Sequence, residues 1–144
     1  MTISPMPDAE QTLSQWITDE FRVHAEKHGI TCEFQHFAFA AKEGDEVAGV
    51  ITGHAYFNEA YVNYLVVSEK FRGQHLGSRL LETVEKHCRS VGVDSILLTT
   101  YDFQAPGFYE KNGFTCIMKR ENSKDPRFTK YYYAKKFENV EENL

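Results

Sequence analysis

A six-residue loop between an apolar run and an amphipathic stretch has the composition of an anion-binding site. Its residues, with the one that follows, are Arg72, Gly73, Gln74, His75, Leu76, Gly77 and Ser78. A loop that opens a helix leaves backbone N–H groups unpaired, and the positive end of the helix dipole favours an anion beside them. Glycines let the backbone approach phosphate oxygens, and Arg72 adds a charge-assisted contact. The pattern points to a pyrophosphate, although two glycines near a helix start also occur in ordinary turns.

The histidines and cysteines show no spacing typical of metal ligands. His36 and His54 lie inside predicted strands, and we interpret them as ordinary strand residues. Cys32, Cys88 and Cys116 are odd in number and form no CxxC pair, so we expect reduced thiols, most of them buried. The sequence predicts no metal site.

Length and composition indicate one globular domain. The chain has 144 residues, of which 42% are hydrophobic and 14% aromatic. A net charge of −5 argues against a general nucleic-acid binder, which is normally basic. No apolar run reaches the roughly 20 residues of a membrane helix, and the N-terminus lacks the layout of a signal peptide. We expect a cytoplasmic domain over residues 1–137, followed by an acidic, frayed tail at 138–144.

The N-terminal part is expected to form a short edge strand at residues 2–4 and then a helix. Asp8 is a suitable N-cap, Gln11 is placed to complete a capping box, and Gly29 ends the helix. The apolar residues between them follow one helical stripe: Leu13, Trp16, Ile17, Phe21 and Ala25. This stripe predicts a helix packed on a sheet.

Three strands are expected next, all antiparallel. Runs 34–41 and 47–57 are apolar and aromatic, and the turn residues at 43–46 predict a hairpin between them. Run 61–67 is aromatic and β-branched, which is typical of a strand covered on both faces.

Helices and strands then alternate to the C-terminus. A helix from Leu76 is amphipathic, and the apolar run 95–101 predicts a strand parallel to 61–67. A short helix at 104–111, capped by Gly113, leads to strands at 114–118 and 131–137 around a polar loop at 120–127. The predicted fold class is α/β (α+β), with a mixed, mostly antiparallel sheet of six or seven strands and helices on both faces.

Two motifs in this order resemble those of the GCN5-related N-acetyltransferase (GNAT) superfamily. LVVSEKFRGQHLGSRLL is similar to the family's acetyl-CoA signature, Arg/Gln-x-x-Gly-x-Gly/Ala, at residues 72–77, and APGFYEKNGF is close to its Ala-x-x-x-Tyr-x-x-x-Gly-Phe. The resemblance covers nearly the whole chain. His75 replaces the first signature glycine. His75 can donate its N–H if it adopts a helical conformation, and we expect cofactor binding to survive, with the imidazole either near a phosphate or in solvent.

The resemblance implies roles for particular residues. The amides of the 72–78 loop would bind the pyrophosphate of acetyl-CoA, and backbone of Leu65, Val66 and Val67, on a strand splayed from its neighbour, would pair with the pantetheine arm. The N–H of Val66 or Val67 would stabilise the thioester oxygen. Tyr109, the tyrosine of the second motif, would protonate the departing thiolate.

The general base is not assigned by the resemblance. Relatives often carry a glutamate where this chain has Asn63, and an amide cannot act as a base. Glu59, Tyr61 and Asp102 are weak candidates. Asp102 is also a candidate cofactor contact, because the family often has an asparagine near that position.

These features imply an acetyl-CoA-dependent N-acetyltransferase. In such an enzyme a primary amine of a small molecule or a peptide attacks the acetyl thioester directly. The acidic balance favours a cationic acceptor, and a homodimer through the C-terminal strands is one option. The alternative is a non-catalytic acyl-CoA-binding or regulatory domain of the same fold. A dinucleotide-binding enzyme fits poorly, because G-x-G-x-x-G is absent from the sequence.

Overall fold

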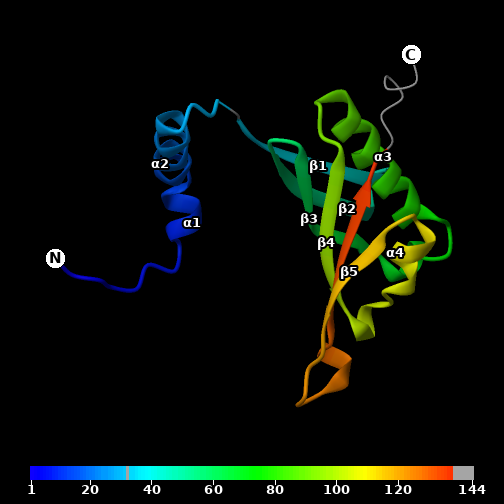
Figure 1. Cartoon of the computed structure of the whole chain (residues 1–144). Coiled ribbons are helices and arrows are strands. Elements are labelled where there is room, and N and C mark those ends of the chain that lie inside the picture. Colours follow the sequence, from blue (N-terminus) through cyan, green and yellow to red (C-terminus); the bar gives the residue numbers. More distant parts are fainter. Residues whose placement is uncertain (32, 138–144) are drawn as a thin grey trace. The chain divides into compact units, whose positions relative to one another are not determined.

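The computed structural model describes residues 1–31 and 33–137 (Figure 1), so Cys32 and the predicted acidic tail lie outside the described residues. The chain divides into two compact units, Met1–Phe34 and a second unit that begins at Gln35. The single domain expected over 1–137 stays a prediction. In the described ranges, no helix combines the length and the apolar composition needed to cross a membrane.

The first unit consists of two helices, α1 (Ala9–Thr12) and α2 (Ser14–Lys27). Residues 2–4 form no strand, and Pro5 and Pro7, which lack a backbone donor, follow them directly. The predicted capping box is also wrong, because the Asp8 carboxylate accepts a hydrogen bond from the Thr12 hydroxyl at 2.9 Å instead of capping an N–H. Gly29 follows α2 with φ +71°, as predicted. Packing of this helix on the sheet stays a prediction.

The second unit contains a six-stranded sheet in the order β1-β2-β3-β4-β6-β5. The strands are β1 (Phe34–Glu43), β2 (Glu46–Tyr56), β3 (Glu59–Val67), β4 (Ser95–Tyr101), β5 (Thr115–Arg120) and β6 (Lys130–Lys136). β3 and β4 are parallel, whereas the pairs β2–β3, β4–β6 and β5–β6 are antiparallel. The mixed, mostly antiparallel sheet predicted from the sequence is confirmed.

Helix α3 (Leu76–Ser90) connects the parallel strands and covers one face of the sheet (Figure 1, green). Its apolar stripe is buried as the periodicity predicts: Leu80, Leu81, Val84 and Cys88. These side chains pack with Ile51, Ile96 and Tyr133 from three strands of the sheet. Burial raises the pKa of the Cys88 thiol to about 11, so this cysteine behaves as an apolar core residue.

One expectation about burial is wrong. β3 is not covered on both faces: Ala60 is fully buried, whereas Tyr61, Tyr64 and Val66 are exposed, because side chains alternate between the two faces and the extra residue Asn63 shifts the alternation by one. Of the two described cysteines, Cys88 is buried and Cys116, on the edge strand β5, is exposed, so the burial of most of the three stays a prediction.

Between β4 and β5 the chain forms a 3-10 turn, η2 (Asp102–Gln104), and the short helix α4 (Gly107–Lys111). Ala105 joins them in the left-handed region, with φ +61°. Asn112 caps α4 and Gly113 follows with φ +88°, as the Asn-Gly pair predicts. η3 (Pro126–Phe128) lies in the loop before β6.

Glu85 links α3 to the C-terminal strand. Lys135 Nζ on β6 donates to Glu85 Oε2 at 2.9 Å and to the Asn112 carbonyl at 3.0 Å, and Arg89 donates to Glu85 Oε1 at 3.2 Å. Burial alone would raise the pKa of Glu85, but the hydrogen bonds from Lys135 and Arg89 outweigh it and lower the pKa below its usual value. The ionised carboxylate therefore stabilises the fold.

We expect Glu85→Gln to lower the free energy of unfolding by about 1 kcal/mol at pH 7. Because the folded-state pKa is lowered, this contribution is present above the unfolded pKa and is lost as pH falls through the folded pKa. Urea unfolding at pH 7 and at about pH 3 measures the difference, with Glu82→Gln, an exposed neighbour on α3, as control. A pH-independent difference would contradict an ionic role for Glu85.

Candidate active site

The parallel strands β3 and β4 separate after three residues. Their paired positions are Glu59–Ser95, Ala60–Ile96 and Tyr61–Leu97. Beyond Tyr61 and Leu97, both strands continue and stay paired on their other sides, β3 with β2 and β4 with β6. The two edges that face each other past this point therefore carry backbone N–H and C=O groups outside the sheet ladder.

The β3 arm of this opening contains the backbone expected to pair with an amide-rich ligand. Leu65 and Val67 turn half-buried side chains to the core side, and Val66 is exposed on the other face. Because their neighbours on β4 have diverged, the outward N–H and C=O groups of this arm have no strand partner on that side. Such an edge can accept an extended chain as a further strand would.

A register shift in the β2–β3 ladder lies next to the point of separation. Thr52 pairs with Tyr64, whereas Gly53 pairs with Val62, so Asn63 is the extra residue on β3. A bulge of this kind changes the direction of a side chain beside a site. The Asn63 side chain is exposed, and its Oδ1 lies 3.0 Å from His54 Nδ1 on β2.

The loop between β3 and α3 presents several unpaired amides. The N–H of Arg79 donates to the carbonyl of His75, which makes His75 the N-cap of α3. The amides of His75, Leu76, Gly77 and Ser78 precede the first intrahelical bond and have no acceptor within the helix. The loop follows the carboxyl end of β3, on the same side as the opening between the strands. It can bind an anion there.

The backbone of this loop is left-handed at two positions. Gly73 has φ +83° and His75 has φ +58°. His75 therefore lacks the right-handed helical conformation under which its N–H was predicted to be available, and it takes a left-handed one between the 3-10 turn η1 (Glu69–Phe71) and α3. Histidine enters the left-handed region more readily than most residues, so a glycine-like backbone is kept without glycine.

Substitutions at His75 test this backbone conformation. We expect His75→Val to lower the free energy of unfolding by about 1–2 kcal/mol, because a β-branched residue is strained at positive φ. His75→Gly relieves the strain but adds freedom to the unfolded chain, so its stability should stay within about 0.5 kcal/mol of the original. Urea unfolding measures both. Equal stability of the valine and glycine variants would contradict a left-handed His75.

Gly77 brings the start of α3 against the helix that carries Tyr109. A Cβ at Gly77 would lie 2.9 Å from Cζ of Phe108, so any larger residue would require the Phe108 ring to shift. Tyr109 is half-buried, with ring contacts to Phe108, Phe114 and Tyr133 at centroid distances of 5.1, 5.9 and 5.8 Å. Burial raises the pKa of the Tyr109 phenol above its ordinary value, so the hydroxyl stays protonated at neutral pH.

The base candidates do not all belong to one site. Glu59 pairs with Ser95 at the start of β4, whereas Asp102 follows the end of β4, about 20 Å further along the strand. Asp102 Oδ1 accepts a hydrogen bond from the Tyr131 hydroxyl at 3.0 Å. Tyr61 lies at the point of separation, where its ring stacks on that of His54 at 5.4 Å.

Two groups of residues near the opening were missed by sequence reasoning. The first is His54, interpreted as an ordinary strand residue, which the structure places beside Asn63 and Tyr61. The second is the pair of stacked tyrosines Tyr131 and Tyr133 on β6. The Tyr133 hydroxyl donates a hydrogen bond to the Glu110 carboxylate, and burial raises the pKa of Tyr133 to about 12. Local sequence patterns carry little information about either group, because both groups are brought together by pairing between strands.

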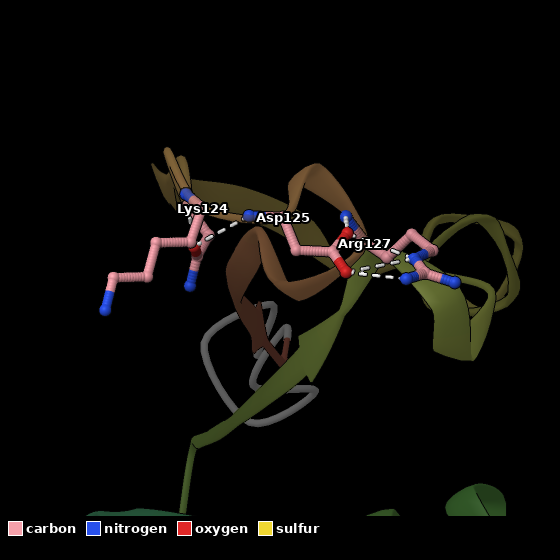
Figure 2. A network of polar contacts seen from close by, with 4 residues as sticks. Lys124, Asp125 and Arg127 are labelled. Atoms are coloured by element: carbon pink, nitrogen blue, oxygen red, sulfur yellow. Dashed lines mark hydrogen bonds and ion pairs between the residues drawn. The ribbon is translucent and has the colours of Figure 1, made fainter.

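A cavity of about 560 Å³ lies past the end of β4. Its walls come from η2, β5, β6 and the 121–129 loop, and its charged residues are Asp102, Lys119 and Glu121. The loop is held by its own hydrogen bonds (Figure 2): Asp125 accepts from the backbone and side chain of Arg127, at 3.0 and 2.7 Å. These bonds hold the pKa of the Asp125 carboxyl below its usual value. Within the described ranges, no cluster of three metal-ligating side chains is present.

Comparisons with known proteins agree with this arrangement. Residues 7–114 match the model of the Acetyltransferase (GNAT) family. A blasticidin-S acetyltransferase from Streptomyces morookaense is 39% identical over 77 residues, which are 53% of this chain and 57% of that protein. The chain thus matches little more than half of that relative's length.

Solved structures share the fold. An acetyltransferase from Bacillus cereus ATCC 14579 superimposes with a TM-score of 0.74 at 22% identity, covering 95% of this chain and 98% of that one. A protein from Bacillus anthracis str. Ames in complex with acetyl coenzyme A has a TM-score of 0.64 at 22% identity, covering 72% and 64%. Because the family match spans residues 7–114 and contains both the amide loop and Tyr109, this chain belongs to the GNAT family of acetyltransferases.

Proposed function

We propose that this protein transfers the acetyl group of acetyl-CoA to a primary amine of a small molecule. The observation that carries the proposal is the separation of β3 from β4 beyond Tyr61 and Leu97, next to the unpaired amides at the start of α3. The two features supply what the donor requires: an open strand edge for an amide-rich arm and backbone donors for a pyrophosphate.

Backbone groups of this chain are proposed to bind the donor and to stabilise its reacting carbonyl. The amides of His75, Leu76, Gly77 and Ser78 bind the pyrophosphate, and the exposed backbone of Leu65, Val66 and Val67 pairs with the pantetheine arm. Acetyl-CoA supplies an activated thioester carbonyl. The N–H of Val66 or Val67 donates to the carbonyl oxygen as negative charge develops on it.

Tyr109 is the proposed donor to the leaving thiolate. Its hydroxyl is protonated at neutral pH because burial raises its pKa. A thiolate near pKa ~8.5 leaves more readily when a phenol hydrogen-bonds or protonates it. The ring is fixed by aromatic contacts on three sides, which keeps the hydroxyl in one place.

The proposed acceptor is a cationic small molecule. The cavity past the end of β4 is lined by the carboxylates of Asp102 and Glu121 and by the ammonium of Lys119, so negative charge is in excess there, and the chain as a whole carries a net charge of −5. Such a site attracts an ammonium group. The similarity to a blasticidin-S acetyltransferase supports a small-molecule amine rather than a peptide.

Isothermal titration with acetyl-CoA and with free CoA tests donor binding. We expect saturable binding of both, weakened several-fold by Gln74→Glu, which places a negative charge in the amide loop. Gln35→Glu on β1 makes the same change outside the site and should bind normally. Absence of binding by the folded protein would overturn the proposal.

Thiol release in the presence of blasticidin S and a panel of primary amines then tests transfer. Turnover with a small-molecule amine supports an enzyme, whereas tight acetyl-CoA binding without turnover on any amine supports the alternative, a non-catalytic acyl-CoA-binding domain.

A further inference from the structure

His54 and Asn63 form a cross-strand pair at the point where β3 and β4 separate. His54 Nδ1 lies 3.0 Å from Asn63 Oδ1. His54 pairs with Tyr61, which is also the last β3 residue paired with β4. The bulge that makes Asn63 an extra residue in β3 lies one position further along. The pair therefore lies where the opening begins, on the same strand as Val66 and Val67, which the proposed function places at the thioester oxygen.

The partner atom fixes the tautomer of His54. The side-chain oxygen of an asparagine is an acceptor only, so the hydrogen bond requires the proton on His54 Nδ1. A neutral imidazole with Nδ1–H carries its lone pair on Nε2. This is the state that a general base needs, and the hydrogen bond to Asn63 also becomes stronger when the ring gains a positive charge.

The surroundings hold the ring in one orientation. The Tyr61 ring stacks on the imidazole with a centroid distance of 5.4 Å and an angle of 15° between the planes. His54 is half-buried, so its position is restricted without being closed to a ligand. The titratable side chains that share this face are Tyr61 and Glu59 on β3, Tyr56 on β2 and His36 on β1.

His54 and Tyr109 occupy opposite faces of the sheet. Gly53 and Ala55, the neighbours of His54 on β2, are buried toward the core, so His54 points to the other face. Tyr109 packs on Tyr133, which pairs with Leu98 of β4 on the core side. Leu98 is the first β4 residue beyond the separation. A base and an acid thus lie on the two sides of the opening.

We infer that His54 is the general base of the reaction and that Asn63 positions it, an inference that rests on the proposed function. Nε2 of His54 removes a proton from the ammonium group of the acceptor. The amine nitrogen bonds to the acetyl carbon, the C–S bond breaks, and the sulfur takes the Tyr109 proton. The second proton lost by the nitrogen returns to the tyrosinate through solvent, and His54 releases its proton to water. The products are one amide, one thiol and one proton.

The His54→Gln variant tests the role of the imidazole. We expect kcat to fall roughly 100-fold or more, because a positioned base contributes about that much, with the Kd for acetyl-CoA unchanged. The kcat/KM profile should lose the rising limb that deprotonation of a general base produces. Added imidazole should restore part of the activity of His54→Ala. His36→Gln, on exposed strand β1, is the matched control and should keep the original profile.

A second measurement does not depend on an acceptor or on a variant that folds. The ¹⁵N shifts of the His54 ring distinguish the two tautomers, and we expect the Nδ1–H form in the original protein. Asn63→Leu should shift His54 toward the Nε2–H form and lower kcat about 10-fold with acetyl-CoA binding intact. A dominant Nε2–H form in the original protein, or an unchanged pH profile in His54→Gln, would overturn the inference. Either result could occur while acetyl-CoA is bound and transferred, so the proposed function would stand.

Discussion

Replacing Tyr109 by phenylalanine is expected to lower kcat roughly 100-fold while leaving the affinity for acetyl-CoA unchanged. The substitution removes only the hydroxyl, the proposed proton donor to the thiolate. The aromatic contacts with Phe108, Phe114 and Tyr133 remain available to phenylalanine, so we expect the folded state to persist. Initial rates of thiol release give kcat, and isothermal titration gives the Kd.

The control for this experiment is Tyr132→Phe. Tyr132 lies on β6 next to Tyr133, on the opposite face of the strand. The Tyr132→Phe variant should keep the original kcat. Because burial raises the Tyr109 pKa, the hydroxyl donor should persist to higher pH than a free phenol would allow. An unchanged kcat in Tyr109→Phe would show that the thiolate leaves without help from this residue.

Gly53→Ala is expected to cause a large loss of stability, about 3 kcal/mol. Gly53 is buried at the register shift of β2, and a Cβ there would meet the backbone carbonyl of Tyr61 and the ring of Phe37. The ring could turn aside, but the carbonyl belongs to the paired strand and moves only with the bulge. The variant therefore has to distort the ladder beside His54 and Asn63.

Urea unfolding measures this loss, and Gly107→Ala is the matched control. Gly107 begins α4 with a negative φ, and a Cβ at this position would meet no atom within 4 Å, so alanine there should be neutral or slightly stabilising. If Gly53→Ala unfolds within about 1 kcal/mol of the original protein, the close approach of β2 and β3 at the bulge is wrong.

Much of the fold follows from local sequence signals. The stripe of Leu80, Val84 and Cys88 predicted α3 and its buried face, and the apolar run at 95–101 predicted β4 with the correct bounds. The edge strand at 2–4 and the Asp8 capping box were wrong, because a strand needs a partner and a cap needs a particular local geometry. Neither requirement is visible in residue types alone.

The conformation of His75 shows the same limit at the site. The sequence shows a histidine where related loops have glycine, and donation by its N–H was predicted on the condition that the residue is helical. The direction of the chain between η1 and α3 requires positive φ at that point. Backbone conformation in a short loop depends on the two elements that it joins, so it cannot be derived from the loop residues.

The sequence by itself determined the family, the helix after the amide loop and the position of Tyr109, because these depend on residues close together in the chain. Only the tertiary structure showed that β3 and β4 separate beyond Tyr61 and Leu97, and that Glu59 and Asp102 lie at opposite ends of β4. It alone placed His54 beside Asn63, since the register of β2 and β3 includes a bulge that no local pattern predicts. Contacts across strands depend on register, and register is set by the packing of the whole sheet.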